Sequence, residues 1–163
     1  MCVDFAYKDW EQGGKKWALR NIKLRTSRKL LFLAGLCMVF SCFRNSDLAR
    51  PLDPNVDYRV KLQEHLGNFA LSTPINIVLW TVLACGLDTE AAQLLDVYEE
   101  YLTLISDLNS REYLEKLSER AVYEDSLFLR FRTISHRLQE VLTAICFDKD
   151  SEFREFIREY GVF

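Results

Sequence analysis

Glycine and proline are scarce in this sequence, which has six glycines and three prolines among 163 residues. The glycines form neither a G-x-G-x-x-G nor a G-x-x-x-x-G-K-[ST] motif, so a glycine-rich loop that cradles nucleotide phosphates is excluded. The 49% share of hydrophobic residues indicates an ordered chain rather than a disordered one. At this length we expect a single domain covering residues 1–163.

Histidine is also scarce, and its scarcity restricts the possible chemistry. The two histidines do not form an H-E-x-x-H motif, so the usual ligands of a zinc site are missing. The five cysteines include no C-x-x-C pair, and four of them lie in apolar helical patterns. We interpret them as small buried side chains in a reducing compartment. The sequence therefore predicts no metal and no cofactor.

One stretch has the residue spacing of a calcium site. Acidic or amide residues occupy positions 1, 3, 5 and 12 of an EF-hand loop, namely Asp53, Asn55, Asp57 and Glu64. Tyr58 stands where that loop needs glycine for its sharp turn, so the turn cannot form in the usual way. We interpret the stretch as a polar loop followed by a helix.

Targeting and membrane segments are not indicated. The first ten residues contain Asp4, Lys8 and Asp9, which a secretory signal peptide would lack, so we predict a cytoplasmic protein. Residues 30–43 carry no charge, but this run is too short to cross a hydrocarbon core of about 30 Å, and such runs are typical of buried helices. The second uncharged stretch, residues 66–87, is interrupted by polar residues and Pro74. We predict no membrane contact.

The apolar residues recur with helical spacing along most of the chain. Helices are predicted over residues 17–43, 75–85, 89–108, 110–121, 126–147 and 152–160. Residues 56–63 fit either a strand or a helix, and we favour the helix because a lone strand has no partner. Two helices, residues 30–43 and 75–85, are apolar on all sides. The sequence therefore predicts an all-α irregular bundle of six or seven helices with two apolar central helices.

Expected helix ends follow from local signals. The run Ser72-Thr73-Pro74 is typical of a helix start, with a hydroxyl available as N-cap and proline at the first helical position, and Gly86 is typical of a helix end. We expect the helix over residues 110–121 to begin at Ser110. Ser151 is the predicted cap of the last helix, and Gly161 its end.

Charge is distributed unevenly. Residues 15–29, the basic segment, contain seven basic residues and no acidic one; residues 1–50 carry a net charge of +6 and residues 51–163 carry −9. On a helix, Lys16, Arg20 and Lys23 share one stripe, and Arg28 turns away from it. The candidate binding residues are Lys16, Arg20, Lys23, Arg25 and Arg28.

Two interpretations of the basic segment stay open. It can pair internally with the acidic helices, or it can meet a nucleic acid, a phosphate ligand or an acidic protein surface. The glutamates of those helices are Glu99, Glu100, Glu112, Glu115 and Glu119. We predict a non-catalytic interaction or regulatory module with a basic face, which also allows a homodimer. The size of the chain and the basic helix leading into an apolar one also suggest an accessory helical domain of a nucleotidyltransferase-type protein.

Arg130 and His136 carry the one catalytic alternative. Their Arg-x5-His spacing is similar to the motif of HEPN helical domains, some of which are metal-independent RNases. The resemblance covers seven residues, and Phe131 stands where that family commonly has a polar residue. It implies that Arg130 stabilises phosphate charge and His136 moves a proton at a dimer cleft. The structural alternative places both residues on the solvent side of their helix.

Overall fold

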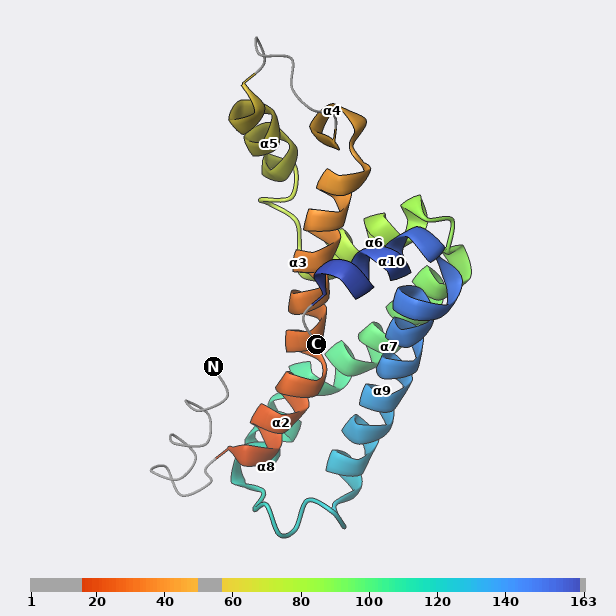
Figure 1. Ribbon diagram of the computed structural model, residues 1–163. Coiled ribbons are helices and arrows are strands. Elements are labelled where there is room, and N and C mark those ends of the chain that lie inside the picture. Colours follow the sequence, from red (N-terminus) through yellow and green to blue (C-terminus); the bar gives the residue numbers. More distant parts are fainter. Residues whose placement is uncertain (1–15, 50–56, 162–163) are drawn as a thin grey trace. The chain divides into compact units, whose positions relative to one another are not determined.

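The computed structural model describes residues 16–49 and 57–161, and their regular secondary structure is helical throughout (Figure 1). In chain order the elements are α2 (Trp17–Arg25), α3 (Ser27–Arg44), α4 (Ser46–Ala49), α5 (Tyr58–Gly67), α6 (Pro74–Ala84), α7 (Asp88–Ser106), α8 (Leu108–Lys116), α9 (Ser126–Thr143), the π-helical turn η1 (Ala144–Lys149) and α10 (Ser151–Tyr160). When α2 and α3 count as one helix and η1 as the end of α9, the described ranges hold seven helices longer than one turn. The predicted all-α bundle of six or seven helices is confirmed.

The helices divide into two compact units. Unit 1 comprises residues 1–28 and 93–141, and unit 2 comprises residues 29–92 and 142–163. Helices α3, α7 and α9 each contribute residues to both units. The single helical domain over residues 1–163 stays a prediction.

Unit 1 is held together by an aromatic core. The Trp17 ring lies 6.0 Å from that of Phe128, and Tyr101 meets Phe131 edge-on at 6.1 Å. The hydroxyl of Tyr101 is also 2.7 Å from that of Ser27, so this buried tyrosine keeps a polar partner. These contacts join α2 and the first turn of α3 to α7 and α9.

Unit 2 is organised around Phe40 on α3. Its ring lies 4.7 Å from Phe153 and 5.1 Å from Phe156, both on α10. Val78 and Val82 of α6 are fully buried in the same unit. Removing such a ring costs about 3–5 kcal/mol because it leaves a cavity, so this cluster anchors the C-terminal helix.

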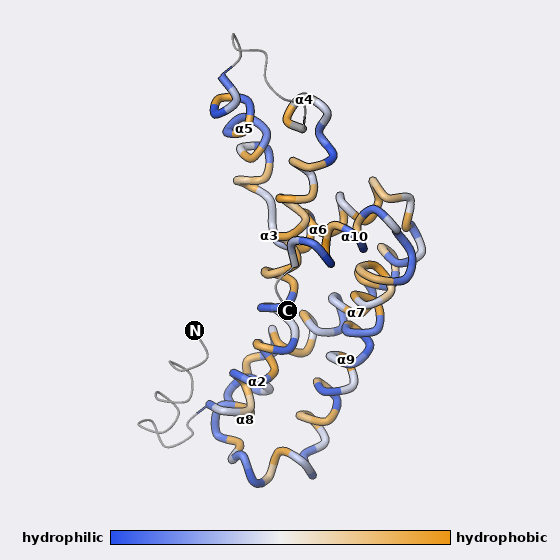
Figure 2. Tube along the Cα trace, in the orientation of Figure 1, coloured by the Kyte–Doolittle hydropathy of each residue, from blue (hydrophilic) through white to orange (hydrophobic). Residues whose placement is uncertain are grey.

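The two apolar helices of unit 2 are each buried on one side only. On α3 the buried residues are Leu30, Leu33, Ala34, Cys37 and Phe40, which share one face. On α6, Trp80 is 51% exposed and Leu83 47% exposed. Each of these two helices therefore has a buried face and also exposes part of its apolar surface. Figure 2 shows the hydrophobic residues running along α3 and α6.

Helix starts agree with the sequence where a capping side chain is adjacent. The Thr73 hydroxyl accepts a hydrogen bond from the Asn76 amide, with Pro74 as the first helical residue. Asp57 caps α5, which confirms the helix over the alternative strand. Gly86 follows α6 with φ of 73°, a left-handed conformation that glycine adopts without strain.

Three predicted boundaries are wrong. Helix α8 begins at Leu108 because the Asp107 carboxylate caps it, and it ends at Lys116 instead of Ala121. Helix α10 is capped by Asp150, so Ser151 becomes the first helical residue. Gly161 does follow the last residue of α10, as predicted, although its φ of −75° is not left-handed.

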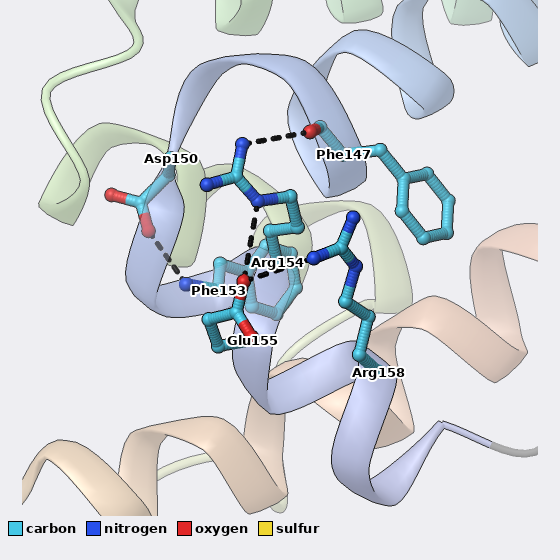
Figure 3. A network of polar contacts seen from close by, with 6 residues as sticks. All are labelled: Phe147, Asp150, Phe153, Arg154, Glu155 and Arg158. Carbon is cyan, nitrogen blue, oxygen red and sulfur yellow. Dashed lines mark hydrogen bonds and ion pairs between the residues drawn. The ribbon is translucent and has the colours of Figure 1, made fainter.

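The connection between α9 and α10 is a polar network around η1 (Figure 3). The Asp150 carboxylate accepts a 2.6 Å hydrogen bond from the Phe153 amide. The Arg154 guanidinium donates to the Phe147 carbonyl at 3.4 Å and pairs with Glu155 at 3.6 Å. Since the last carbonyls of a helix lack internal donors, Arg154 satisfies one of them and fixes the turn.

Candidate functional site

The basic segment begins with an internal ion pair. The Lys16 ammonium lies 2.9 Å from the Glu115 carboxylate, which connects the start of α2 to α8. This hydrogen bond lowers the pKa of Glu115, and the nearby charges of Lys16, Arg111 and Lys23 lower it further. Two of the predicted binding residues, Lys16 and Lys23, therefore act on an acidic side chain of unit 1.

The other end of the segment lies beside α9. The Ser135 hydroxyl donates to the Arg25 carbonyl at 3.4 Å, so the last turn of α2 is next to the middle of α9. Arg25 and Arg28 are exposed, as are Arg132 and His136, which flank Ser135 on α9. We call these four exposed residues, Arg25, Arg28, Arg132 and His136, the basic patch. The fifth predicted binding residue, Arg20, is half-buried and makes its own interactions.

Unit 1 carries no net charge. It contains thirteen Lys/Arg and thirteen Asp/Glu, whereas unit 2 contains eight and eleven, in agreement with the total of −3. The excess positive charge of the N-terminal segment is thus balanced by acids of α7, α8, α9 and their connections. A long-range positive field is not expected from unit 1 as a whole, and any anion binding must come from a local patch.

Arg130 and His136 point in different directions along α9. Six residues separate them, which corresponds to about 120° around the helix axis and about 9 Å along it. The Arg130 guanidinium lies 3.7 Å from the Glu100 carboxylate, which also pairs with Arg137. Both candidate residues are exposed, as the structural alternative expects. Within one chain they do not converge on a common point.

His65 is part of a polar cluster that sequence reasoning missed. Its Nε2 lies 2.9 Å from the Ser41 hydroxyl oxygen, and its Nδ1 lies 3.2 Å from the Asn45 amide nitrogen. The Ser41 hydroxyl donates to the Met38 carbonyl at 2.7 Å. With that proton committed, Nε2–H donates to Ser41, the reverse of the proton transfer that a catalytic base would perform. We interpret the cluster as a hydrogen-bonded tie between α3 and α5.

A continuous apolar stripe runs along the outer face of α3. Four large side chains on it are about half exposed or more: Leu31 (61%), Phe32 (48%), Val39 (56%) and Phe43 (50%). Gly35 is exposed between them, and a Cβ built there has open space within 4 Å. We call these five residues the α3 stripe.

A groove of about 440 Å³ continues the α3 stripe towards α5 and α10. Its walls are almost entirely apolar or aromatic, and it is lined by Val39, Cys42, Phe43, Leu48, Tyr58, Leu62, Phe156 and Tyr160. Val39 and Phe43 belong to both features, so stripe and groove form one surface of unit 2. A surface this apolar is typical of a protein contact or a ligand groove.

The helical stretch Trp17–Arg44 is, by length and composition, able to cross a membrane, and a third of its apolar window is buried. The core helix of a water-soluble protein can pass the same test. One face of α3 is committed to the core of unit 2 through Phe40 and its neighbours. The absence of membrane contact stays a prediction.

The four described cysteines are free thiols, and two of them, Cys37 and Cys146, are buried. Burial raises the pKa of Cys37 and of Cys146 to about 12, so both are protonated at neutral pH. Within the described ranges no three His, Cys, Asp or Glu side chains gather as metal ligands. Of the calcium-like spacing, Asp53 and Asn55 lie outside the described residues.

Comparisons with protein families, with curated proteins and with solved structures found no match to this chain.

Proposed function

We propose that this protein is a non-catalytic helical interaction module that binds another protein chain through the apolar surface of unit 2. The observation that carries the proposal is the α3 stripe, four large apolar side chains exposed on one helix face beside an apolar groove. Exposed apolar area costs solubility unless a partner covers it, and each Å² removed from water contributes about 25 cal/mol.

The test compares two glutamate variants at exposed apolar positions. Val39→Glu places a charge at the junction of stripe and groove, whereas Leu83→Glu alters α6 outside both. The tagged full chain is used as bait in cell extract, and captured proteins are identified by mass spectrometry. We expect a partner that is lost with Val39→Glu and retained with Leu83→Glu. Equal capture by both variants and the wild type would contradict the proposal.

A second candidate function is the binding of a nucleic acid or another polyanion at the basic patch. It is favoured by the hydrogen bond from the Ser135 hydroxyl to the Arg25 carbonyl, because this contact places the backbone of Arg25 beside α9, which carries Arg132 three residues before Ser135. Each contacted phosphate releases counterions, so the logarithm of the affinity falls linearly with the logarithm of the salt concentration. We expect contacts to the phosphate backbone without a preference for base sequence, since no base-reading motif is present in the sequence.

Fluorescence anisotropy with a labelled single-stranded RNA and a DNA duplex tests this candidate. We expect binding at low salt that weakens steeply as salt rises, and the double variant Arg25→Gln/Arg132→Gln should reduce the salt slope by about two. Arg120→Gln, an exposed arginine elsewhere in unit 1, serves as the control for total charge. No binding by the folded protein at low salt would remove this candidate.

The catalytic alternative, a HEPN-like RNase, predicts cleavage of RNA that disappears in His136→Ala. If the wild type cleaves RNA and His136→Ala does not, the non-catalytic proposal is refuted, because His136 is the only base proposed for the reaction. The accessory-domain alternative predicts instead that the captured partner is a nucleotidyltransferase. The extract experiment above distinguishes it directly.

A further inference from the structure

We infer that the protein partner of the α3 stripe is a second copy of this chain, with two α3 helices crossing antiparallel at Gly35. The inference rests on the proposed function, since it names the occupant of the same surface. Three features carry it: the shape of the stripe, the absence of charge along it, and the exposed area that it offers.

The stripe is complementary to itself. Leu31, Gly35, Val39 and Phe43 follow one another at intervals of four residues, so they form one ridge along α3. Gly35 makes a notch in that ridge, since a Cβ there would meet nothing within 4 Å. A symmetric dimer needs one patch with both projecting and recessed parts. With Gly35 on the twofold axis, Leu31 of one copy packs beside the partner's Val39.

Charge favours a second copy over an anionic surface. The stripe lies within residues 30–43, which contain no charged residue, so two copies meet there without burying an ion. Unit 2 has eleven acidic and eight basic residues, which disfavours binding of its surface to anionic lipid or nucleic acid.

Orientation follows from the ends of α3. Arg28 is exposed and continues the stripe at its N-terminal end, because it precedes Phe32 by one helical turn. Parallel packing would bring the two Arg28 side chains together. Antiparallel packing separates the two Arg28 side chains, and it also opposes the two helix dipoles.

The area indicates a weak dimer. Half-exposed aromatic side chains each offer on the order of 100 Å², so stripe and groove rim together provide on the order of 500 Å² per copy. The total of about 1,000 Å² is at the lower limit for a specific interface. We therefore expect a monomer–dimer equilibrium that depends on protein concentration within the micromolar range.

Sedimentation equilibrium of the full chain tests the inference. We expect wild type to shift from monomer to dimer with concentration, Val39→Glu to weaken the dimer at least tenfold, and Leu83→Glu to leave it unchanged. A buried unpaired carboxylate costs several kcal/mol, which justifies the tenfold bound. Circular dichroism establishes that each variant is folded.

Gly35→Leu separates a specific dimer from general stickiness. The added side chain has room in the monomer and increases apolar area, so nonspecific association would become stronger. The crossing proposed here would instead be blocked, and the dimer would weaken. Wild type that stays monomeric, or a Gly35→Leu dimer as tight as wild type, would overturn the inference.

Co-sedimentation with phosphatidylcholine/phosphatidylserine vesicles tests whether the α3 stripe binds a lipid surface instead of a second copy. Vesicle binding by a monomeric wild type that is lost in Val39→Glu would assign the stripe to a lipid surface and overturn the second-copy proposal. A wild type that stays monomeric but captures a different protein, with capture lost in Val39→Glu, would also overturn the second-copy proposal. The proposed function as an interaction module would then still stand.

Discussion

Lys16 and Glu115 form an ion pair with 2.9 Å between nitrogen and oxygen, at the point where the basic segment enters α2. Lys16 adopts a left-handed backbone conformation with φ of 65° as the residue preceding the helix. The pair therefore joins an unusual helix start to α8, and it turns part of the basic segment towards an acidic helix.

Removing this lysine is expected to change the titration of its partner. In Lys16→Met the pKa of Glu115 rises towards its ordinary value, because the hydrogen bond and the adjacent charge that hold it down are lost. A depressed carboxyl pKa stabilises the fold above the unfolded pKa, and this contribution disappears as pH falls through the folded pKa. Carbon-detected NMR of the glutamate carboxyls measures the shift.

Lys116→Met provides the matched control, since it removes the same charge from an exposed position on α8. We expect a smaller rise in the Glu115 pKa from this variant than from Lys16→Met. Equal effects of the two variants would show that the ion pair at 2.9 Å has no special role.

His65 is expected to hold α5 against α3. His65→Ala removes the hydrogen bonds to Ser41 and Asn45, which should cost about 1–2 kcal/mol of local stability. The measurement is hydrogen exchange of the α5 amides, which should become faster relative to those of α9. His136→Ala, an exposed histidine on α9, should leave α5 protection unchanged. Unchanged exchange in His65→Ala would refute the tie.

Gly35 and Gly86 should respond in opposite ways to the same change. Gly35→Ala lies within α3 with open space around it, so it should stabilise the monomer by up to about 1 kcal/mol through helix propensity. Gly86→Ala forces φ of 73° on a side-chain-bearing residue and should destabilise by about 1–2 kcal/mol. Urea unfolding at a concentration below dimerisation measures both, and the same sign for both variants would contradict the prediction.

Asp150 should matter more than Ser151 for the last helix. Asp150→Ala removes the carboxylate that accepts from the Phe153 amide, with an expected loss of about 1 kcal/mol. Ser151→Ala replaces the first helical residue and should have a smaller effect. Thermal unfolding of the two variants tests this, and a larger loss from Ser151→Ala would restore the sequence-based assignment of the cap.

Most helices could be predicted from sequence because their ends carry local signals. The Thr73 hydroxyl accepts a hydrogen bond from an amide three residues later in the chain. The Asp57 carboxylate accepts one from an amide two residues later. Where two capping residues are neighbours, as at Asp150 and Ser151, sequence alone does not decide between them. The one-residue error at α10 has that origin.

The polar cluster at His65 and the α3 stripe were less predictable because both depend on contacts between distant residues. Ser41 and His65 are 24 positions apart, and neither belongs to a recognisable motif. The uncharged run 30–43 identified α3 as apolar, but an apolar sequence does not tell which side is covered. The stripe is defined by the structure, in which Phe40 and Cys37 occupy the opposite, buried face of α3.

The packing of α10 depends on the number of residues in the π-helical turn η1 more than on which residues form that turn. A π-turn accommodates one residue more than the α-helix around it. Deleting one residue there would let α9 continue as a regular helix, and everything that follows would rotate by about 100°. The rings of Phe153 and Phe156 would then no longer contact Phe40, although the sequence would still contain all three residues.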